Sequence, residues 1–142
     1  MQIKQRVFLY TLLLGSGGWF VSFFFTFTSW SVSENILHGM GAEKIAYQPL
    51  LDYWLKMASS AFGCIGIMYF ICFLNPKRYF YTINLLSYMS IFVGAVISYS
   101  AIKNKLSYPA HPTFIIDIIF CFYVGVVSLY FNYSINRDKK ME

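Results

Sequence analysis

Four long apolar runs dominate this chain of 142 residues and constrain its fold more than any other feature. They extend over about 7–30, 50–74, 80–102 and 113–132. Each run has roughly 20 residues or more, enough for a helix to cross about 30 Å of hydrocarbon at about 1.5 Å per residue. Because backbone groups in lipid must be hydrogen bonded within their own segment, each run is expected to be helical. The sequence therefore predicts an all-α fold, an integral membrane four-helix bundle that forms a single transmembrane domain over 1–142.

Composition supports a membrane protein and argues against nucleic-acid binding. Only 12% of the residues are charged and 58% are hydrophobic, whereas soluble domains carry about 25% charged residues. The formal net charge is +5, but the basic residues form no stripe or patch of the kind that binds nucleic acid. They lie in small groups at the ends of the apolar runs, so membrane lipids are the expected surroundings.

The distribution of lysine and arginine predicts the orientation. With the N-terminus in the cytoplasm, the cytoplasmic side carries Lys4, Arg6, Lys77, Arg78, Arg137, Lys139 and Lys140. The opposite side then carries Lys44, Lys103 and Lys105. Because basic residues are enriched on the cytoplasmic side of membrane proteins, this asymmetry predicts that both termini are inside (N-in/C-in).

Small residues recur at three- and four-residue spacing along each run, which places them on one helix face. Such stripes let membrane helices approach closely. The glycines that we expect in these contacts are Gly18, Gly63, Gly66, Gly94 and Gly125. A ligand groove along the same stripes is the alternative.

Charged residues within the runs mark the candidate site. Lys56 and Asp117 lie at similar depth from the same side of the membrane. Asp52 lies one turn outward of Lys56, in the i,i+4 order that favours an ion pair. An unpaired charge in hydrocarbon costs roughly 2.5–3.5 kcal/mol at a helix centre. We therefore expect Lys56 and Asp117 to pair across the bundle, with Asp52 nearer the surface.

Two interpretations of this cluster remain open. In the first, the pair only fixes the register of the helices, with Lys56 extending toward the surface. In the second, a small polar pocket opens to the outer leaflet and takes an amphipathic ligand, such as a lipid headgroup or a quinone-like molecule. Its expected lining is Asp52, Tyr53, Lys56 and Asp117, with His38 or His111 at the mouth.

Several chemistries find no support in the sequence. Cys64, Cys72 and Cys121 form no Cys-x-x-Cys pair and all lie within apolar runs, as small core residues do. The two histidines lie in predicted outer loops without a carboxylate cluster, so neither haem nor a metal site is expected. No phosphate-binding glycine loop or nucleophile motif is present. The sequence predicts no cofactor and favours a non-enzymatic role.

The longest predicted loop, 31–48, carries apolar residues interspersed with polar ones. It is expected either to lie on the outer membrane surface and cover the mouth of the bundle, or to be a plain connector.

A family resemblance rests on three stretches of the sequence. They are Tyr53-Trp-Leu-Lys-Met-Ala followed by Gly63 and Gly66, then Asn75-Pro-Lys-Arg-Tyr, then Phe114-Ile-Ile-Asp followed by Gly125. Over roughly residues 50–130 the chain resembles small bacterial four-helix membrane proteins of the DoxX-like kind. The resemblance implies a compact bundle in a bacterial inner membrane, with a basic residue early in the second helix and an acidic one early in the fourth. Lys56 and Asp117 match these two positions.

Two functions are compatible with these features. The first is an accessory or interaction subunit of a larger inner-membrane complex, whose partners are other membrane protein subunits or further copies of the chain. The alternative is a small module that binds or transports a lipid- or quinone-like ligand near the outer leaflet.

Overall fold

A computed structural model describes residues 3–108, 111 and 113–138 of the chain. The regular elements in these residues are all helical. The long helices are α1 (Ile3–Phe20), α4 (Pro49–Leu74), α5 (Phe80–Lys103) and α6 (Phe114–Asp138). The short elements are the 3-10 turn η1 (Val21–Phe23), α2 (Phe24–Phe27) and α3 (Trp30–Gly39). The predicted all-α fold is confirmed.

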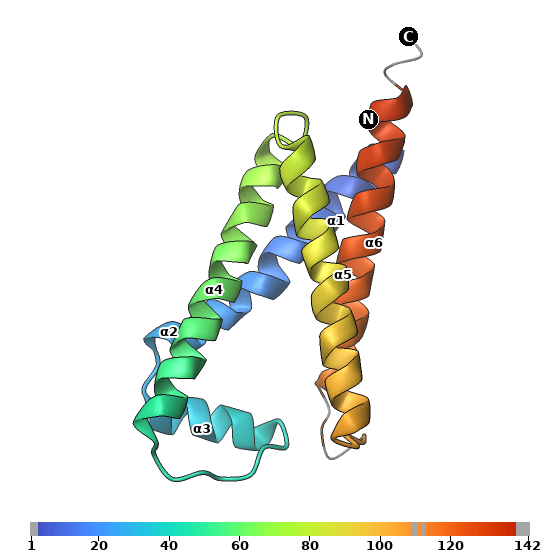
Figure 1. The fold of residues 1–142 in the computed structure, drawn as a ribbon. Helices are drawn as coiled ribbons and strands as arrows, with labels where there is room; N and C mark the ends of the chain where they lie inside the picture. Colours follow the sequence, from blue (N-terminus) through green and yellow to red (C-terminus); the bar gives the residue numbers. More distant parts are fainter. Residues whose placement is uncertain (1–2, 109–110, 112, 139–142) are drawn as a thin grey trace.

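The four long helices form two packed pairs, α1 with α4 and α5 with α6, and a contact between α1 and α6 joins the pairs (Figure 1). α1 runs obliquely along α4 and also contacts α6, while α5 packs along α6. α4 and α5 lie close together at the turn over 75–79 and diverge toward their other ends. This turn, the start of α1 and the end of α6 lie at one end of the bundle, which we call the turn end. We call the opposite end, where α3 lies, the α3 end.

The described residues contain four helical segments that are long and apolar enough to cross a membrane. They are Ile3–Phe27, Pro49–Leu74, Phe80–Lys103 and Phe114–Ile135. Only 22% to 33% of the most apolar window of each segment is buried by the rest of the chain, so most of these side chains face outward. So large an exposed apolar surface is unfavourable in water and favourable in the hydrocarbon of a membrane. The predicted membrane four-helix bundle is therefore confirmed, and its orientation stays a prediction.

Local sequence sets the ends of α4. Pro49 is at the start of the helix, where its missing N–H leaves no hydrogen bond unmade. At the other end Asn75 leaves the helical conformation with φ −145°, and its side-chain oxygen accepts a hydrogen bond of 3.3 Å from the N–H of Arg78. The second and third predicted spans agree with α4 and α5 to within one residue at each end.

The first span differs from the prediction of one helix over 7–30. The helix begins at Ile3, tightens at η1 and ends at Phe27, after which Thr28 is extended with φ −85° and ψ 151°. Trp30 starts a new helix instead of closing the first span. The apolar run continues unbroken through this corner, so hydrophobicity alone does not reveal it.

The segment predicted as a loop over 31–48 contains most of the amphipathic helix α3. Its Ser33 hydroxyl is buried and lies 2.8 Å from the hydroxyl of Thr28. The ring of Trp30 packs edge-on against that of Tyr47. α3 runs across this end of the bundle, from the start of α4 toward the end of α5 (Figure 1). This position agrees with the alternative in which the segment covers the mouth of the bundle.

Two glycines let α4 lie directly on the first membrane segment. A Cβ on Gly66 would lie 2.6 Å from the backbone nitrogen of Phe20, closer than real side chains approach. A Cβ on Gly63 would overlap the ring of Phe23. At Gly66 the two backbones therefore meet directly, and at Gly63 the Phe23 ring packs on the bare backbone of α4, as small residues permit in membrane helices.

Glycines also mediate the contacts of α6 with its neighbours. A Cβ on Gly94 of α5 would lie 3.2 Å from the side chain of Cys121. A Cβ on Gly125 would lie 2.8 Å from the carbonyl oxygen of Ser87. At Gly18 of α1, a Cβ would overlap a phenylalanine ring of α6. All five glycines expected in helix contacts thus face another part of the bundle.

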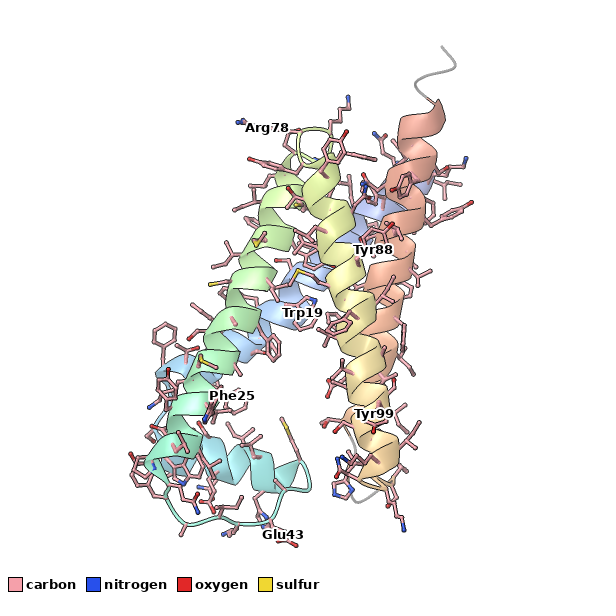
Figure 2. The ribbon with its side chains drawn as sticks, in the orientation of Figure 1. Trp19, Phe25, Glu43, Arg78, Tyr88 and Tyr99 are labelled. Atoms are coloured by element: carbon pink, nitrogen blue, oxygen red, sulfur yellow. The ribbon has the colours of Figure 1, made fainter. Side chains whose placement is uncertain are left out.

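Trp19 lies where three helices meet (Figure 2). Its indole is 6% exposed and projects from α1 between α4 and the α5–α6 pair. The indole packs against Phe62 of α4 with 5.3 Å between ring centroids, and against Phe120 of α6 with 5.9 Å. The Trp19 ring therefore links α1 to both α4 and α6.

Buried polar side chains add two cross-helix links. The hydroxyls of Tyr69 on α4 and Ser90 on α5 are 2.9 Å apart. Near the turn end, the Asn132 amide of α6 donates to the side-chain oxygen of Asn84 at 2.8 Å and to the carbonyl of Phe80 at 2.9 Å. In hydrocarbon such groups find no water, so these bonds favour one arrangement of the helices.

We expect Gly66→Ala to destabilise the bundle by about 1–3 kcal/mol, because the added methyl group meets backbone atoms that cannot rotate away. Gly39→Ala in α3 is the control, since no described atom lies within 4 Å of a Cβ at that position. Unfolding of both variants in mixed detergent micelles measures the difference. Equal stability of the two would contradict the close contact between α1 and α4.

Candidate functional site

Lys56 pairs with Asp52 on its own helix. The Lys56 Nζ lies 2.8 Å from the Asp52 Oδ2, one turn away. Asp52 is in the first turn of α4, where the partial positive charge of the helix N-terminus stabilises a carboxylate. Lys56 lies deeper and reaches outward, as lysines near the ends of membrane helices do. Since 40% of the Lys56 side chain and 16% of the Asp52 side chain are exposed, the pair lies near the surface of the bundle.

A cluster of hydroxyls connects this pair to the first membrane segment. The hydroxyls of Ser59 and Ser60 both donate to the carbonyl oxygen of Lys56, at 3.1 Å and 2.6 Å. The Thr26 hydroxyl lies 3.0 Å from that of Ser59 and 3.2 Å from that of Ser60. Because a hydroxyl has a single hydrogen, both serines are already committed as donors, and Thr26 is the donor to one of them. The cluster is therefore satisfied internally and ties α2 to α4.

Asp117 lies apart from this cluster. It is in the first turn of α6, on the face that continues with Cys121 and Val124, and it is exposed. Among the residues that the structure describes, its carboxylate makes no ion pair and no side-chain hydrogen bond. The expected pair between Lys56 and Asp117 is therefore wrong.

The direction in which Lys56 faces explains this correction. Ser59 and Gly63, on the same face of α4, contact Thr26 and the ring of Phe23. α4 reaches α5 through a different face, that of Tyr69. The predicted depth of the charges agrees with the structure, but their directions around the helices do not bring them together.

The remaining predicted site residues are dispersed. Tyr53 is 59% exposed on the outer surface of α4. His38, at the end of α3, is exposed, with its Nδ1 2.9 Å from the carbonyl oxygen of Ala42. His111 lies in the connection between α5 and α6, and its Nδ1 is buried without a partner within the described part of the chain. No contact described in the structure joins either histidine to the Lys56–Asp52 pair.

The three cysteines are free thiols. Cys72 and Cys121 are buried in the core, whereas Cys64 is exposed on α4. Within residues 3–108, 111 and 113–138, no three His, Cys, Asp or Glu side chains are placed to hold a metal ion. The positions of Cys72 and Cys121 agree with the interpretation of the cysteines as small core side chains, but that interpretation is wrong for the exposed Cys64.

An open groove between α1 and α6 is a feature that the sequence analysis missed. Its volume is about 520 Å³, and it is lined by Tyr10, Leu13, Leu14, Gly17, Gly18 and Tyr123. Gly17 is exposed there, with no atom within 4 Å of the place that a Cβ would occupy. The signal in the sequence is the cluster Gly15, Gly17 and Gly18. Positions three apart lie on the same face of a helix, so Gly15 and Gly18 pack inward together. Gly17 lies on another face of α1 and therefore points outward.

No protein-family model, curated protein or solved structure matches this chain. The resemblance to DoxX-like membrane proteins therefore stays a prediction.

A double-mutant cycle tests the assignment of the ion pair. Lys56→Met and Asp52→Asn are expected to couple by roughly 0.3–1 kcal/mol, the range for partly exposed i,i+4 pairs. Lys56→Met and Asp117→Asn are expected to be additive to within about 0.5 kcal/mol, because no contact joins the two residues. Unfolding in mixed micelles gives both values. A larger coupling to Asp117 than to Asp52 would restore the cross-bundle pair.

Proposed function

We propose that the chain is a non-enzymatic accessory subunit that packs against another protein within the membrane. The observation that carries this proposal is Gly17, a bare glycine on the outer face of α1 beside an open groove. Glycine inside a helix is unfavourable by roughly 0.5–1 kcal/mol relative to alanine. Within the described residues, no atom packs against the place of the missing side chain. A missing side chain is useful where a second helix backbone approaches.

The interior of the bundle supports the same proposal. Gly63 and Gly66 are covered by the first membrane segment, and the Lys56–Asp52 pair is satisfied within α4. The small-residue faces that could have lined a ligand groove are thus occupied by neighbouring helices. The small-residue face of α4 is therefore not free for a partner, whereas Gly17 on the outer surface is.

We further propose that the turn end faces the cytoplasm. Lys4, Lys77 and Arg78 lie at that end, with Arg78 labelled in Figure 2. Lys139 and Lys140, expected on the same side, lie outside the described residues. Enrichment of basic residues on one side is the general determinant of orientation. The bacterial inner membrane as the location rests on the DoxX-like resemblance alone.

The alternative function, binding of a lipid- or quinone-like ligand at the α3 end, has one observation in its favour. Asp117 lies on the inner face of α6 with Cys121 yet is exposed and unpaired within the described part of the chain. An ionisable group in such a place is a candidate for ligand binding. Its position in the first turn of α6 also has a structural explanation, because a carboxylate there interacts favourably with the helix dipole.

Native mass spectrometry of the chain, extracted gently from its own membrane, separates the two functions. A subunit is expected to retain a stoichiometric protein partner, which Gly17→Leu releases. Ala95→Leu is the matched control, because Ala95 is a small exposed residue on the outer face of α5. If the chain instead carries only a lipid or quinone mass, and Asp117→Asn abolishes that mass, the ligand-binding function replaces the subunit proposal.

A further inference from the structure

Tyr123 lies on the wall of the α1–α6 groove, near the middle of the membrane-spanning part of α6. It is nine residues after the start of the span Phe114–Ile135, or about 14 Å along the helix, and about 18 Å before its end. Its side chain is 44% exposed and lines the α1–α6 groove. A tyrosine side chain cannot reach the membrane surface from this depth, so water does not satisfy its hydroxyl.

The Tyr123 hydroxyl also lacks a protein partner, because no hydrogen bond joins it to any residue that the structure describes. A hydroxyl without a partner in hydrocarbon is unfavourable, since the surrounding chains neither donate nor accept. A lipid acyl chain in the groove would leave the hydroxyl unsatisfied. The groove therefore fits an occupant that brings a hydrogen-bonding group to mid-membrane depth.

Gly17 adds a second requirement at the same groove. Because nothing lies within 4 Å of its missing Cβ, the backbone of α1 is open to direct approach. The occupant thus needs a hydrogen-bonding group that reaches Tyr123 and an apolar group that fills the open space over Gly17.

We propose that the groove receives a second copy of this chain, related to the first by a two-fold axis along the membrane normal. This inference rests on the proposed function, and it names the partner. Two copies with the same orientation in the membrane bring residues of equal depth together across such an axis. Because Gly17 and Tyr123 line opposite walls of the groove, the axis sets Tyr123 of each copy over Gly17 of the other, and the two Tyr123 hydroxyls meet beside the axis, one as donor and one as acceptor. The face of this chain meets both requirements of its own groove.

Energy transfer between donor- and acceptor-tagged full-length chains in phosphatidylethanolamine–phosphatidylglycerol vesicles tests the proposal. Both tagged chains carry Cys64→Ser, because Cys64 is an exposed thiol. We expect transfer that falls with dilution in lipid. Tyr123→Phe, which removes only the hydroxyl, is expected to weaken association roughly threefold. Gly17→Leu is expected to weaken it at least roughly tenfold, by steric overlap in the interface.

Two matched variants control for nonspecific effects. Tyr99→Phe removes a hydroxyl near the end of α5, where water is within reach, and Ala95→Leu enlarges a small exposed residue on α5. Both are expected to associate like the unaltered chain. Absence of transfer at high protein density, or transfer that Gly17→Leu leaves unchanged, would overturn the proposal.

Native mass spectrometry keeps this inference separable from the subunit proposal. A chain isolated with a different membrane protein, released by Gly17→Leu, would overturn the second-copy inference and leave the subunit proposal standing. A chain isolated alone, without a second copy or any other protein, would overturn both.

Discussion

The arrangement of the bundle depends on the place where α4 lies against the first membrane segment. At Gly66 the two backbones come so close that a methyl group would meet the main chain of Phe20. This contact fixes the oblique path of α1, which in turn brings Trp19 between α4 and α6. In hydrocarbon, where apolar surface drives no association between helices, close packing of this kind carries much of the specificity.

The packing of the first membrane segment on α4 also determines which partners the charged side chains find. Because the face of α4 that carries Lys56 turns toward α2, the lysine finds its partner one turn outward, in Asp52. Asp117 belongs to a helix that packs mainly on α5 and is left without a partner among the described residues. Both carboxylates occupy first helical turns, so the helix dipole and proximity to the membrane surface make their ionised forms tolerable.

Span positions and packing glycines could be predicted from the sequence because each depends on one helix at a time. Length and apolarity locate α4 to within one residue, and three- and four-residue spacing identifies Gly63 and Gly66 as a contact face. The partner of Lys56 could not be predicted, since depth follows from position along a helix but direction depends on how two helices cross. The corner at Thr28 and the groove beside Gly17 were missed for the same reason, because tertiary contacts create them.

We propose that the face with the groove, and not the outer surface in general, meets another protein. Leu14 lines the groove and is 49% exposed, while Val96 on α5 is 48% exposed, so an isolated chain would show both positions to lipid equally. The most direct measurement is photo-crosslinking in the native membrane with benzoylphenylalanine at either position. We expect a protein adduct from position 14 and only lipid adducts from position 96. Lipid adducts alone from both positions would contradict it.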